Sequence, residues 1–386
     1  MQQREPRRLE ASGIERLRRR IDADITGGRC DGVSLCVDID GSPALDVCAG
    51  FAERRRGRAL ATSDVFVTLS VGKQFTNVVL LQAVEKGAIS FYTPVADVLP
   101  CFSGSAWSGM NIAHLLCHTS GVLPEAPAVP TDVLMDPARL TLFAAARGPA
   151  FAPGSSVGYS TIAAQAVLAE IVRAADGGTR DFAGIVRAEL FEPLGMHDSS
   201  LGRRDDLMPR LCPVIACYDE PGLFDPRGLE AFTDLVSIPG ASMPAGGYLT
   251  TAPDLRRFVR MLGNGGELDG TRLLSSAMLA LCARNQTGAM TNTLFDPILP
   301  VRGWQAWPAY MGLGFYVRGE ALTPGPLPNL GSAATAGGWG AGSTAFWSDP
   351  ARGVSFSLLT TGLMEDTHHI ERVQRLSDIV LSSLSS

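Results

Sequence analysis

Residues 69–77 read LSVGKQFTN and place Lys73 three positions after Ser70. We predict a helix over residues 70–87, because glycine is the favoured residue just past a helix end and Gly87 follows Lys86. Residues three apart share one face of a helix, so Ser70 and Lys73 would be neighbours. The positive end of the helix dipole would also favour negative charge on the Ser70 oxygen.

The choice of lysine at position 73 is informative, because Lys73 and Lys86 are the only lysines among 33 basic residues. A serine hydroxyl is a weak nucleophile unless a neighbouring base takes its proton. A buried lysine can be that base, since desolvation disfavours its charged form, whereas arginine stays protonated. The spacing alone is common by chance, so it requires support from other parts of the chain.

The two ends of the chain are predicted to share one antiparallel sheet covered by helices. Residues 8–27 carry apolar residues at helical spacing and end at two glycines. A hairpin follows that turns at Asp40-Gly41, and a second hairpin near the other end turns between Asp349 and Gly353. A final amphipathic helix has one apolar stripe, formed by Ile370, Val373, Leu376 and Val380.

The middle of the chain is predicted to be mostly helical. Residues 161–176 and 251–262 have helical patterns, and Thr251 is placed to cap the second helix. We therefore predict an α+β fold in which residues 1–68 and 305–386 form a discontinuous sheet domain. Residues 69–304 would form an inserted, mostly helical domain that carries the loops of the substrate site.

Composition excludes several classes of protein. A net charge of −6 over 386 residues argues against a nucleic-acid partner, because phosphate binding needs a basic surface. We find no signal-peptide pattern and no apolar run long enough to cross a bilayer, so we predict no membrane association. The eight cysteines lack CxxC pairs, so we expect reduced thiols in the cytoplasm. Oligomeric state is left open.

Five ordered blocks resemble the serine β-lactamase superfamily, and most closely its class C β-lactamase and family VIII carboxylesterase branch. They are SVGK (70–73), NIAHLLCHTSGV (111–122), PGSSVGYST (153–161), FEPLGMHDSSLG (191–202) and AGGYLTTAPDLRRFVRMLGNGGELDGTRLL (245–274). The resemblance runs from about residue 8 to about residue 383. It implies an antiparallel sheet flanked by helices, with an inserted helical domain.

The resemblance also implies catalytic roles for three residues. Ser70 would be the nucleophile that forms an acyl-enzyme, and Lys73 would hold or receive its proton. Tyr159 matches the family's second general base. A phenol has a pKa near ~10, and we expect the Lys73 ammonium to favour the phenolate, so that the two groups titrate together. No metal and no organic cofactor is implied.

Two positions depart from the family pattern. Thr161 stands where the family usually has an asparagine, so a hydroxyl with one hydrogen-bond donor replaces an amide with two. The third family motif carries a lysine or histidine, but the matching segment here is Gly338-Trp339-Gly340, followed by Ala341, or the same segment shifted by one residue. We expect the backbone N–H groups of Ser70 and Ala341 to form an oxyanion hole. The missing cation favours neutral esters or amides over substrates that carry a carboxylate.

Other polar and aromatic residues of the chain offer further candidate sites. His114 and His118 lie four apart, but Leu115 replaces the glutamate of an HExxH motif, so we interpret both histidines as structural. No serine lies in a GxSxG elbow, which disfavours an α/β-hydrolase. Trp307 falls in a loop before a predicted strand, and we expect that loop to line the acyl or alcohol pocket.

The sequence therefore favours a serine hydrolase acting through an acyl-enzyme, most simply a carboxylesterase on a small-molecule ester or amide. An acyltransferase that passes the acyl group to an alcohol or amine is the main alternative. A β-lactamase or D-amino-acid peptidase is disfavoured by the missing cation. A non-catalytic binding protein is disfavoured because Ser70, Lys73 and Tyr159 are all present.

Overall fold

The sheet contains both ends of the chain, as predicted. The computed structural model describes residues 7–125, 128–219 and 222–385. Its largest sheet has seven antiparallel strands in the order β3-β2-β1-β12-β11-β10-β9. The strands are β1 (Gly32–Ile39), β2 (Ser42–Glu53), β3 (Arg58–Ala59), β9 (Tyr316–Val317), β10 (Ala336–Gly340), β11 (Thr344–Asp349) and β12 (Val354–Thr361).

Local turn chemistry fixes the register of the sheet. Asp40 and Gly41 have φ angles of 50° and 73°, which suit the tight turn between β1 and β2. Gly353, with φ 59°, closes the turn between β11 and β12. β1 then pairs with β12 along its whole length, from Gly32 opposite Thr361 to Ile39 opposite Val354.

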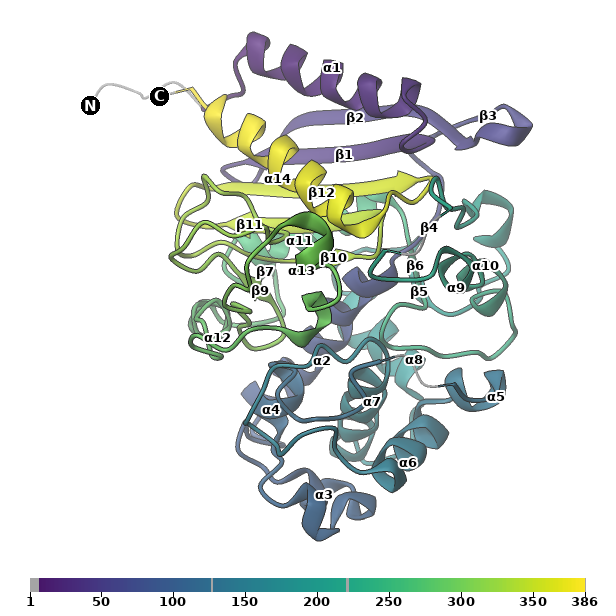
Figure 1. Cartoon of the computed structure of the whole chain (residues 1–386), viewed down its shortest axis with the longest axis vertical. Helices are drawn as coiled ribbons and strands as arrows, with labels where there is room; N and C mark the ends of the chain where they lie inside the picture. The colour runs from purple at the N-terminus through teal and green to yellow at the C-terminus, as the bar shows by residue number, and fades with distance from the viewer. Residues whose placement is uncertain (1–6, 126–127, 220–221, 386) are drawn as a thin grey trace.

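Helices cover both faces of this sheet (Figure 1). α1 (Ala11–Thr26) and α14 (Asp366–Ser382) pack together on one face, where Leu35 and Leu358 point. α11 (Ala252–Gly263) packs on the other face against Leu359 and contacts β1, β11 and β12. Alternate strand residues point to opposite faces, so β1 and β12 are buried throughout. The predicted α+β class is confirmed.

The remaining helices form the lower part of the molecule in Figure 1 and the layer beside the sheet. The α-helices are α2 (Gly72–Glu85), α3 (Val95–Val98), α4 (Ile112–Leu116), α5 (Thr131–Leu134), α6 (Pro137–Arg147), α7 (Ala163–Ala175), α8 (Phe182–Val186), α9 (Pro226–Glu230), α10 (Phe232–Leu235), α12 (Ser276–Cys282) and α13 (Leu299–Arg302). Short 3₁₀ turns are η1 (Arg54–Arg56), η2 (Leu69–Val71), η3 (Pro100–Phe102), η4 (Ser105–Trp107), η6 (Met208–Arg210) and η7 (Thr293–Phe295), and η5 (Arg187–Phe191) is a π-helical turn.

Two small sheets complete the fold. β4 (Phe66–Val67), β6 (Tyr248–Thr250) and β5 (Ser200–Leu201) form a three-stranded sheet in that order. β7 (Glu267–Leu268) and β8 (Thr271–Arg272) form a two-stranded ribbon. α11 lies within residues 69–304 yet packs on the large sheet, so this range also contributes to the sheet layer. The predicted domain boundaries themselves stay a prediction.

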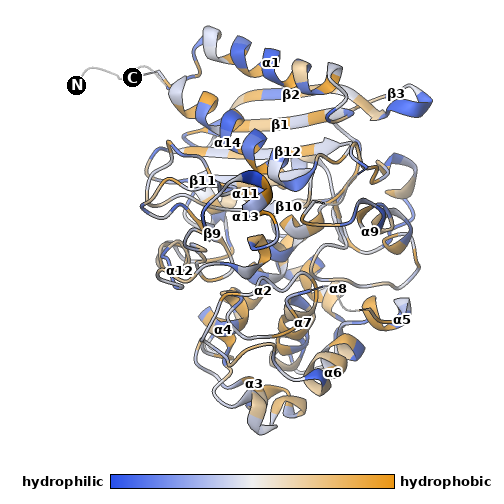
Figure 2. Ribbon diagram, viewed as in Figure 1, coloured by the Kyte–Doolittle hydropathy of each residue, from blue (hydrophilic) through white to orange (hydrophobic). Residues whose placement is uncertain are grey.

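α2 is the central helix of the molecule. Every residue from Gly72 to Gln82 is buried, and the helix packs on α7, which Figure 2 colours as largely hydrophobic. Burial around its whole circumference places this part of α2 in the core, although several of its buried side chains are polar. Gly87 follows its end with φ 74°, as the predicted cap requires. Its beginning differs from the prediction, because Ser70 lies in the preceding turn η2 rather than in the helix.

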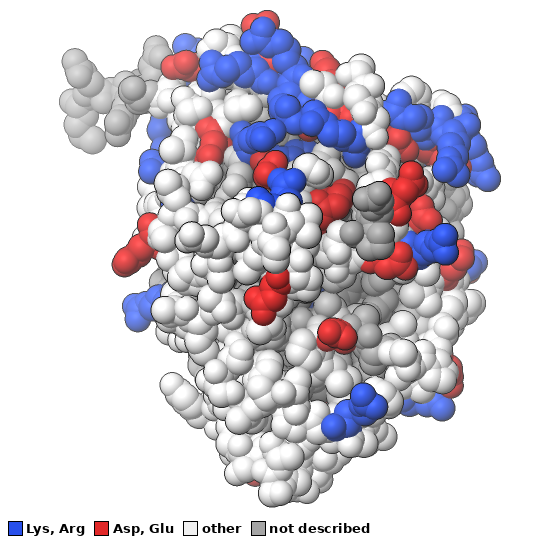
Figure 3. Space-filling model, in the orientation of Figure 1, with Lys and Arg blue, Asp and Glu red and all other residues white. Residues whose placement is uncertain are grey.

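Charge is distributed unevenly over the surface. Figure 3 shows Lys and Arg side chains gathered over α1 and beside β3, whereas the lower part of this face is mostly uncharged. The arginines around Arg18 on α1 are exposed there. Within the described residues, no helix combines the length and the apolar character needed to cross a membrane.

Candidate active site

Ser70 lies in η2, between β4 and the first turn of α2. The preceding residue, Leu69, has a φ of 46°, an uncommon conformation for a residue with a side chain and one often found at functional sites. Gly246 lies behind it, where an added Cβ would come within 3.1 Å of the Leu69 carbonyl carbon. The Ser70 Oγ is 3.0 Å from the Lys73 Nζ, so the predicted neighbours do meet.

Lys73 is buried, with 1% of its surface exposed, and its amine contacts three oxygen atoms. These are the Ser70 Oγ, the Thr161 carbonyl at 2.6 Å and the Ala245 carbonyl at 3.3 Å. Burial lowers the pKa of Lys73 from 10.5 to about 7. A neutral amine can donate one N–H to each carbonyl, and its lone pair is then left for the Ser70 proton. The geometry therefore suits Lys73 to be the base.

Tyr159 completes the cluster but differs from the expectation in its protonation. Its buried ring lies 5.1 Å from the Lys73 Nζ, and its phenol is close enough to the Ser70 hydroxyl for Ser70 to affect its pKa. Burial raises the pKa of Tyr159, and the Ser70 hydroxyl offsets only part of this rise. The expected stabilisation of a phenolate by Lys73 is thus outweighed by desolvation. Tyr159 is better suited to donate a proton to Ser70 than to remove one.

His118 positions the segment that carries Tyr159. Its ring packs 4.4 Å from the Tyr159 ring, its carbonyl accepts the Gly158 N–H and its Nδ1 accepts the Ser160 N–H. Burial, with a smaller effect of Lys73, lowers the pKa of His118 to about 3, so the imidazole stays neutral. His114 caps a helix: its Nδ1 accepts the Asn111 N–H in a capping box at the start of α4.

β10 brings the third motif beside Ser70. A Cβ added at Gly340 would lie 2.9 Å from the Ser70 N and 2.8 Å from the Thr68 carbonyl oxygen, so only glycine allows this approach. Ala341 and Ser70 line the same cavity. Within the described part of the chain, neither backbone N–H donates to another backbone carbonyl outside regular elements. Both groups are therefore available for the predicted oxyanion hole.

We expect Gly340→Ala to reduce kcat by about 100-fold, the effect of losing one oxyanion donor, because the new methyl group forces β10 away from Ser70. Steady-state kinetics on a nitrophenyl ester measures the loss. Gly104→Ala is the matched control, since Gly104 has a φ of −63° and open space around its Cβ position. Equal activity of the two variants would show that β10 does not contribute to the site.

The cavity at Ser70 has a volume of about 600 Å³ and mostly apolar walls. The apolar lining includes Leu134, Ile162, Leu223, Phe224, Leu229, Phe232, Leu235, Met243 and Leu294. The charged lining residues are Glu125 and Asp225, both exposed. Among the described residues that line the cavity there is no lysine, arginine or histidine. Such a volume accommodates a drug-sized apolar ligand.

Thr161 lies where the predicted substrate contact would be. It lines the cavity, and its carbonyl accepts from Lys73. Its Oγ1 is buried and has no hydrogen-bond partner within the described residues. A hydroxyl supplies one donor where an asparagine would supply two, and this one must turn toward the cavity before it can donate to a substrate.

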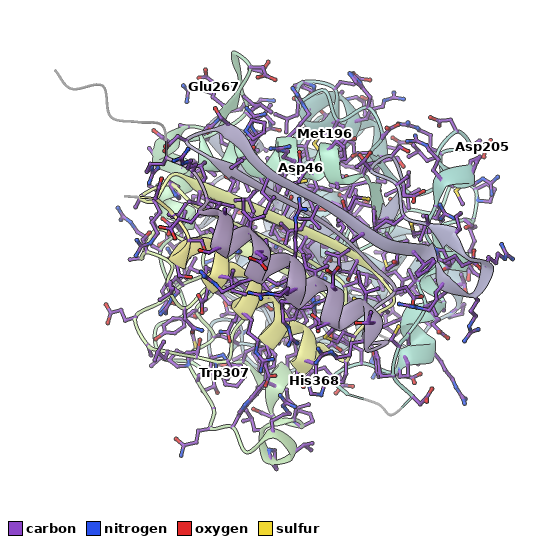
Figure 4. The ribbon with its side chains drawn as sticks, turned by 90° about the horizontal axis from the view of Figure 1, so that it is seen from above. Asp46, Met196, Asp205, Glu267, Trp307 and His368 are labelled. Atoms are coloured by element: carbon purple, nitrogen blue, oxygen red, sulfur yellow. The ribbon has the colours of Figure 1, made fainter. Side chains whose placement is uncertain are left out.

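The other predicted binding residues do not line this cavity. Gly338 faces Gln74, since an added Cβ would come within 2.2 Å of the Gln74 Oε1. Trp339 is buried in the core cluster that also contains Tyr316. Trp307 does not line it either: its ring lies 4.9 Å from the Phe295 ring, tilted by 38°, and lines a separate hollow. Figure 4 shows Trp307 on the side of the sheet that α1 and α14 cover.

Sequence reasoning missed two parts of the site. The Ala245 carbonyl contacts Lys73, and a backbone oxygen leaves no signature in a sequence. Much of the apolar wall comes from α9, α10 and the residues around them. These leucines and phenylalanines look like ordinary core residues in the sequence, and only their position over Ser70 identifies them as wall residues.

Comparisons with known proteins identify relatives of this chain. A family model described as Beta-lactamase matches residues 17–379. Penicillin-binding protein 4 of Amycolatopsis lactamdurans is 31% identical over 308 residues, which cover 76% of each chain. The esterase/β-lactamase LipL of Mycobacterium tuberculosis is 25% identical, over 88% of this chain and 79% of LipL. A family VIII carboxylesterase structure superposes with a TM-score of 0.77 at 20% identity, covering 97% of this chain and 98% of the other.

Proposed function

The chain belongs to the β-lactamase family, and from this premise we propose that it is a carboxylesterase that hydrolyses neutral esters through an acyl-enzyme on Ser70. One observation carries the choice of substrate. The cavity that opens onto Ser70 has apolar walls and only acidic charges among its described lining residues. The relationship to LipL, described as an esterase and β-lactamase, supports the same reaction class.

In the acylation step, the neutral Lys73 amine takes the Ser70 proton while the Ser70 Oγ attacks the ester carbonyl carbon. Negative charge develops on the carbonyl oxygen, where the N–H groups of Ser70 and Ala341 would stabilise it. The tetrahedral intermediate then collapses with loss of the alcohol. The proton held by Lys73 passes to the leaving oxygen, so the alcohol departs neutral and Lys73 is again a free amine.

Deacylation repeats these transfers with water as the nucleophile. The water oxygen attacks the acyl carbon, and its proton passes to Lys73, the group in this cluster with a pKa near neutrality. The Ser70 Oγ leaves as the bond to the acyl carbon breaks. The proton held by Lys73 then passes to the departing Ser70 oxygen, which restores the serine hydroxyl and the free amine. The neutral Tyr159 phenol nearby stabilises the negative charge on that oxygen as it leaves.

Substrate charge gives the sharpest test of this proposal. We expect a nitrophenyl ester whose acyl chain ends in a carboxylate to have a kcat/KM about 10-fold lower than its neutral isostere, because Glu125 and Asp225 repel it. The double variant Glu125→Gln, Asp225→Asn should bring the two kcat/KM values closer together, and the asparagine can still cap α9. High salt should also reduce the difference between the two substrates, because it screens the repulsion.

The same measurements can contradict the proposal. A chromogenic cephalosporin, which carries a carboxylate, should be turned over far more slowly than the neutral ester. Turnover of the cephalosporin at a rate equal to that of the ester would assign the protein to the β-lactamases instead.

Acyl transfer is the second candidate, and the size and apolar character of the cavity favour it. A cavity of about 600 Å³ can hold an acyl group together with an apolar acceptor, and its walls disfavour water. Transfer would share the acylation step and replace water by an alcohol or amine. Adding acceptors to a reaction with a nitrophenyl ester, and comparing the transfer product with the free acid, distinguishes the two activities.

A further inference from the structure

The turn that joins β10 to β11 is held from several directions by buried hydrogen bonds. The Gly342 N–H donates to Asp366 Oδ1 at 3.0 Å, and the Gly342 carbonyl accepts the Met364 N–H at 2.9 Å. The Ser343 carbonyl accepts from Thr360 Oγ1 at 2.7 Å. This turn begins at Ala341, whose N–H is the second member of the oxyanion hole assigned above.

A buried arginine–histidine pair holds the far end of the same turn. Arg372 can only donate, so its contact of 2.7 Å with His369 Nδ1 makes that nitrogen the acceptor. The other ring nitrogen, Nε2, therefore carries the proton and donates to the Thr344 carbonyl at 3.1 Å. The same Arg372 nitrogen also donates to Thr360 Oγ1 at 3.2 Å.

The turn is tied in addition to the segment that carries the nucleophile. Thr344 Oγ1 donates to the carbonyl oxygen of Thr68 at 2.8 Å, two residues before Ser70. A continuous chain of hydrogen bonds therefore runs from Arg372 through His369 and Thr344 to the start of η2. The two segments that supply the oxyanion N–H groups are linked to each other and to α14.

The stability of the fold alone does not account for these residues. Asp366 and His369 are fully buried, and Arg372 is 2% exposed. Asp366 Oδ2 and two Arg372 nitrogens, Nε and Nη1, have no hydrogen-bond partner within the described residues. Buried polar atoms without partners are costly, and apolar residues at the same positions would avoid that cost. Asp366, His369 and Arg372 all lie around the turn that carries the Ala341 N–H, and this placement indicates a role in catalysis.

We propose that Asp366, His369 and Arg372 are positioning residues that hold the turn at residues 341–344. They keep the Ala341 N–H where it and the Ser70 N–H can donate to the same oxyanion. This inference rests on the proposed function, because it assigns a role in stabilising the acyl-transfer transition state. None of the three residues lines the cavity, so they act through the turn. A donor misplaced by less than an ångström loses much of its effect on the transition state.

Asp366 offers the sharpest test. Burial raises the pKa of Asp366 well above its usual range, and its Oδ1 accepts from the Gly342 N–H. Asp366→Asn keeps this acceptor and should retain kcat within about 3-fold. Asp366→Ala loses it, and kcat should fall about 10- to 100-fold with KM nearly unchanged, because a transition-state contact is lost and not substrate binding.

A matched variant separates positioning from simple destabilisation. Ser377 is also buried on α14, but its Oγ accepts from Trp347 Nε1 at 2.7 Å and does not contact the turn. Ser377→Ala should lower the melting temperature without lowering kcat. If Asp366→Ala does not fold, Thr360→Val serves in its place, since it removes the donor to the Ser343 carbonyl and should lower kcat about 3- to 10-fold.

The outcomes separate this inference from the proposed function. Unchanged kcat in the folded Asp366→Ala or Thr360→Val protein overturns the positioning role while esterase activity stands. An equal fall of kcat in Ser377→Ala and Asp366→Ala also overturns it, because the loss would then follow stability. A wild-type protein that forms no acyl adduct on Ser70 would instead remove the proposed function itself.

Discussion

Replacing Ser70 with alanine is expected to reduce kcat for ester hydrolysis by about 10⁴- to 10⁶-fold, the effect seen when a covalent nucleophile is removed from a catalytic unit. The Ser70 Oγ is the one hydroxyl among the three described oxygen atoms that the Lys73 amine contacts, so the base has no other hydroxyl to activate. Any residual rate would come from binding and the oxyanion hole alone.

Intact-protein mass spectrometry after treatment with a fluorophosphonate measures the same property without a substrate. The wild type should gain one adduct, and peptide mapping should place it on Ser70. Ser242→Ala is the control, because the Ser242 Oγ is buried without a hydrogen-bond partner among the described residues, and its loss should leave kcat and labelling intact. An adduct that persists in the Ser70→Ala protein would show that the nucleophile is elsewhere.

Lys73→Met should lower kcat by about 10³- to 10⁴-fold, since a positioned general base contributes up to this amount. Lys73→Arg should be nearly as inactive, because a guanidinium keeps its proton and cannot receive one from Ser70. Lys86→Met is the matched control: Lys86 is the other lysine of the chain, is exposed and contacts Glu189 at 2.9 Å. It should retain the wild-type rate.

The pH dependence follows from the protonation of Lys73. Because burial brings the pKa of Lys73 to about 7, kcat/KM of the wild type should rise with pH and level off above an apparent pKa near 7. The Lys86→Met protein should keep this acidic limb. Full activity of the wild type at pH 5 would contradict the assignment of Lys73 as the base.

The lowered pKa of Lys73 should also make the stability of the fold depend on pH. Between pH 7 and pH 10.5 the unfolded chain binds a proton on Lys73 and the folded chain does not, so the free energy of unfolding rises with pH. Lys73 alone contributes a slope of about 1.4 kcal/mol per pH unit to the free energy of unfolding. The destabilisation caused by burying this amine is fully present below pH 7. Subtracting the unfolding free energy of Lys73→Met from that of the wild type, at several pH values, isolates it.

Much of the fold was predictable because its signals are local. The turn at Asp40-Gly41, the glycine after Lys86 and the Thr251 cap each depend on a few adjacent residues, and the structure confirms all three. The α2 boundary was wrong by two residues because Leu69 adopts a positive φ. Gly246, nearly 180 residues away, packs closely against Leu69, and the local sequence gives no sign of this contact.

The spacing of three residues was enough to predict that Ser70 and Lys73 are neighbours, and they meet where η2 leads into α2. The protonation of these groups depends instead on long-range packing. The pKa values of Lys73 and Tyr159 depend on desolvation by segments remote in the chain, and that burial favours the neutral amine and the neutral phenol. The sequence also could not place Trp307, because proximity along the chain does not decide which side of a sheet a loop covers.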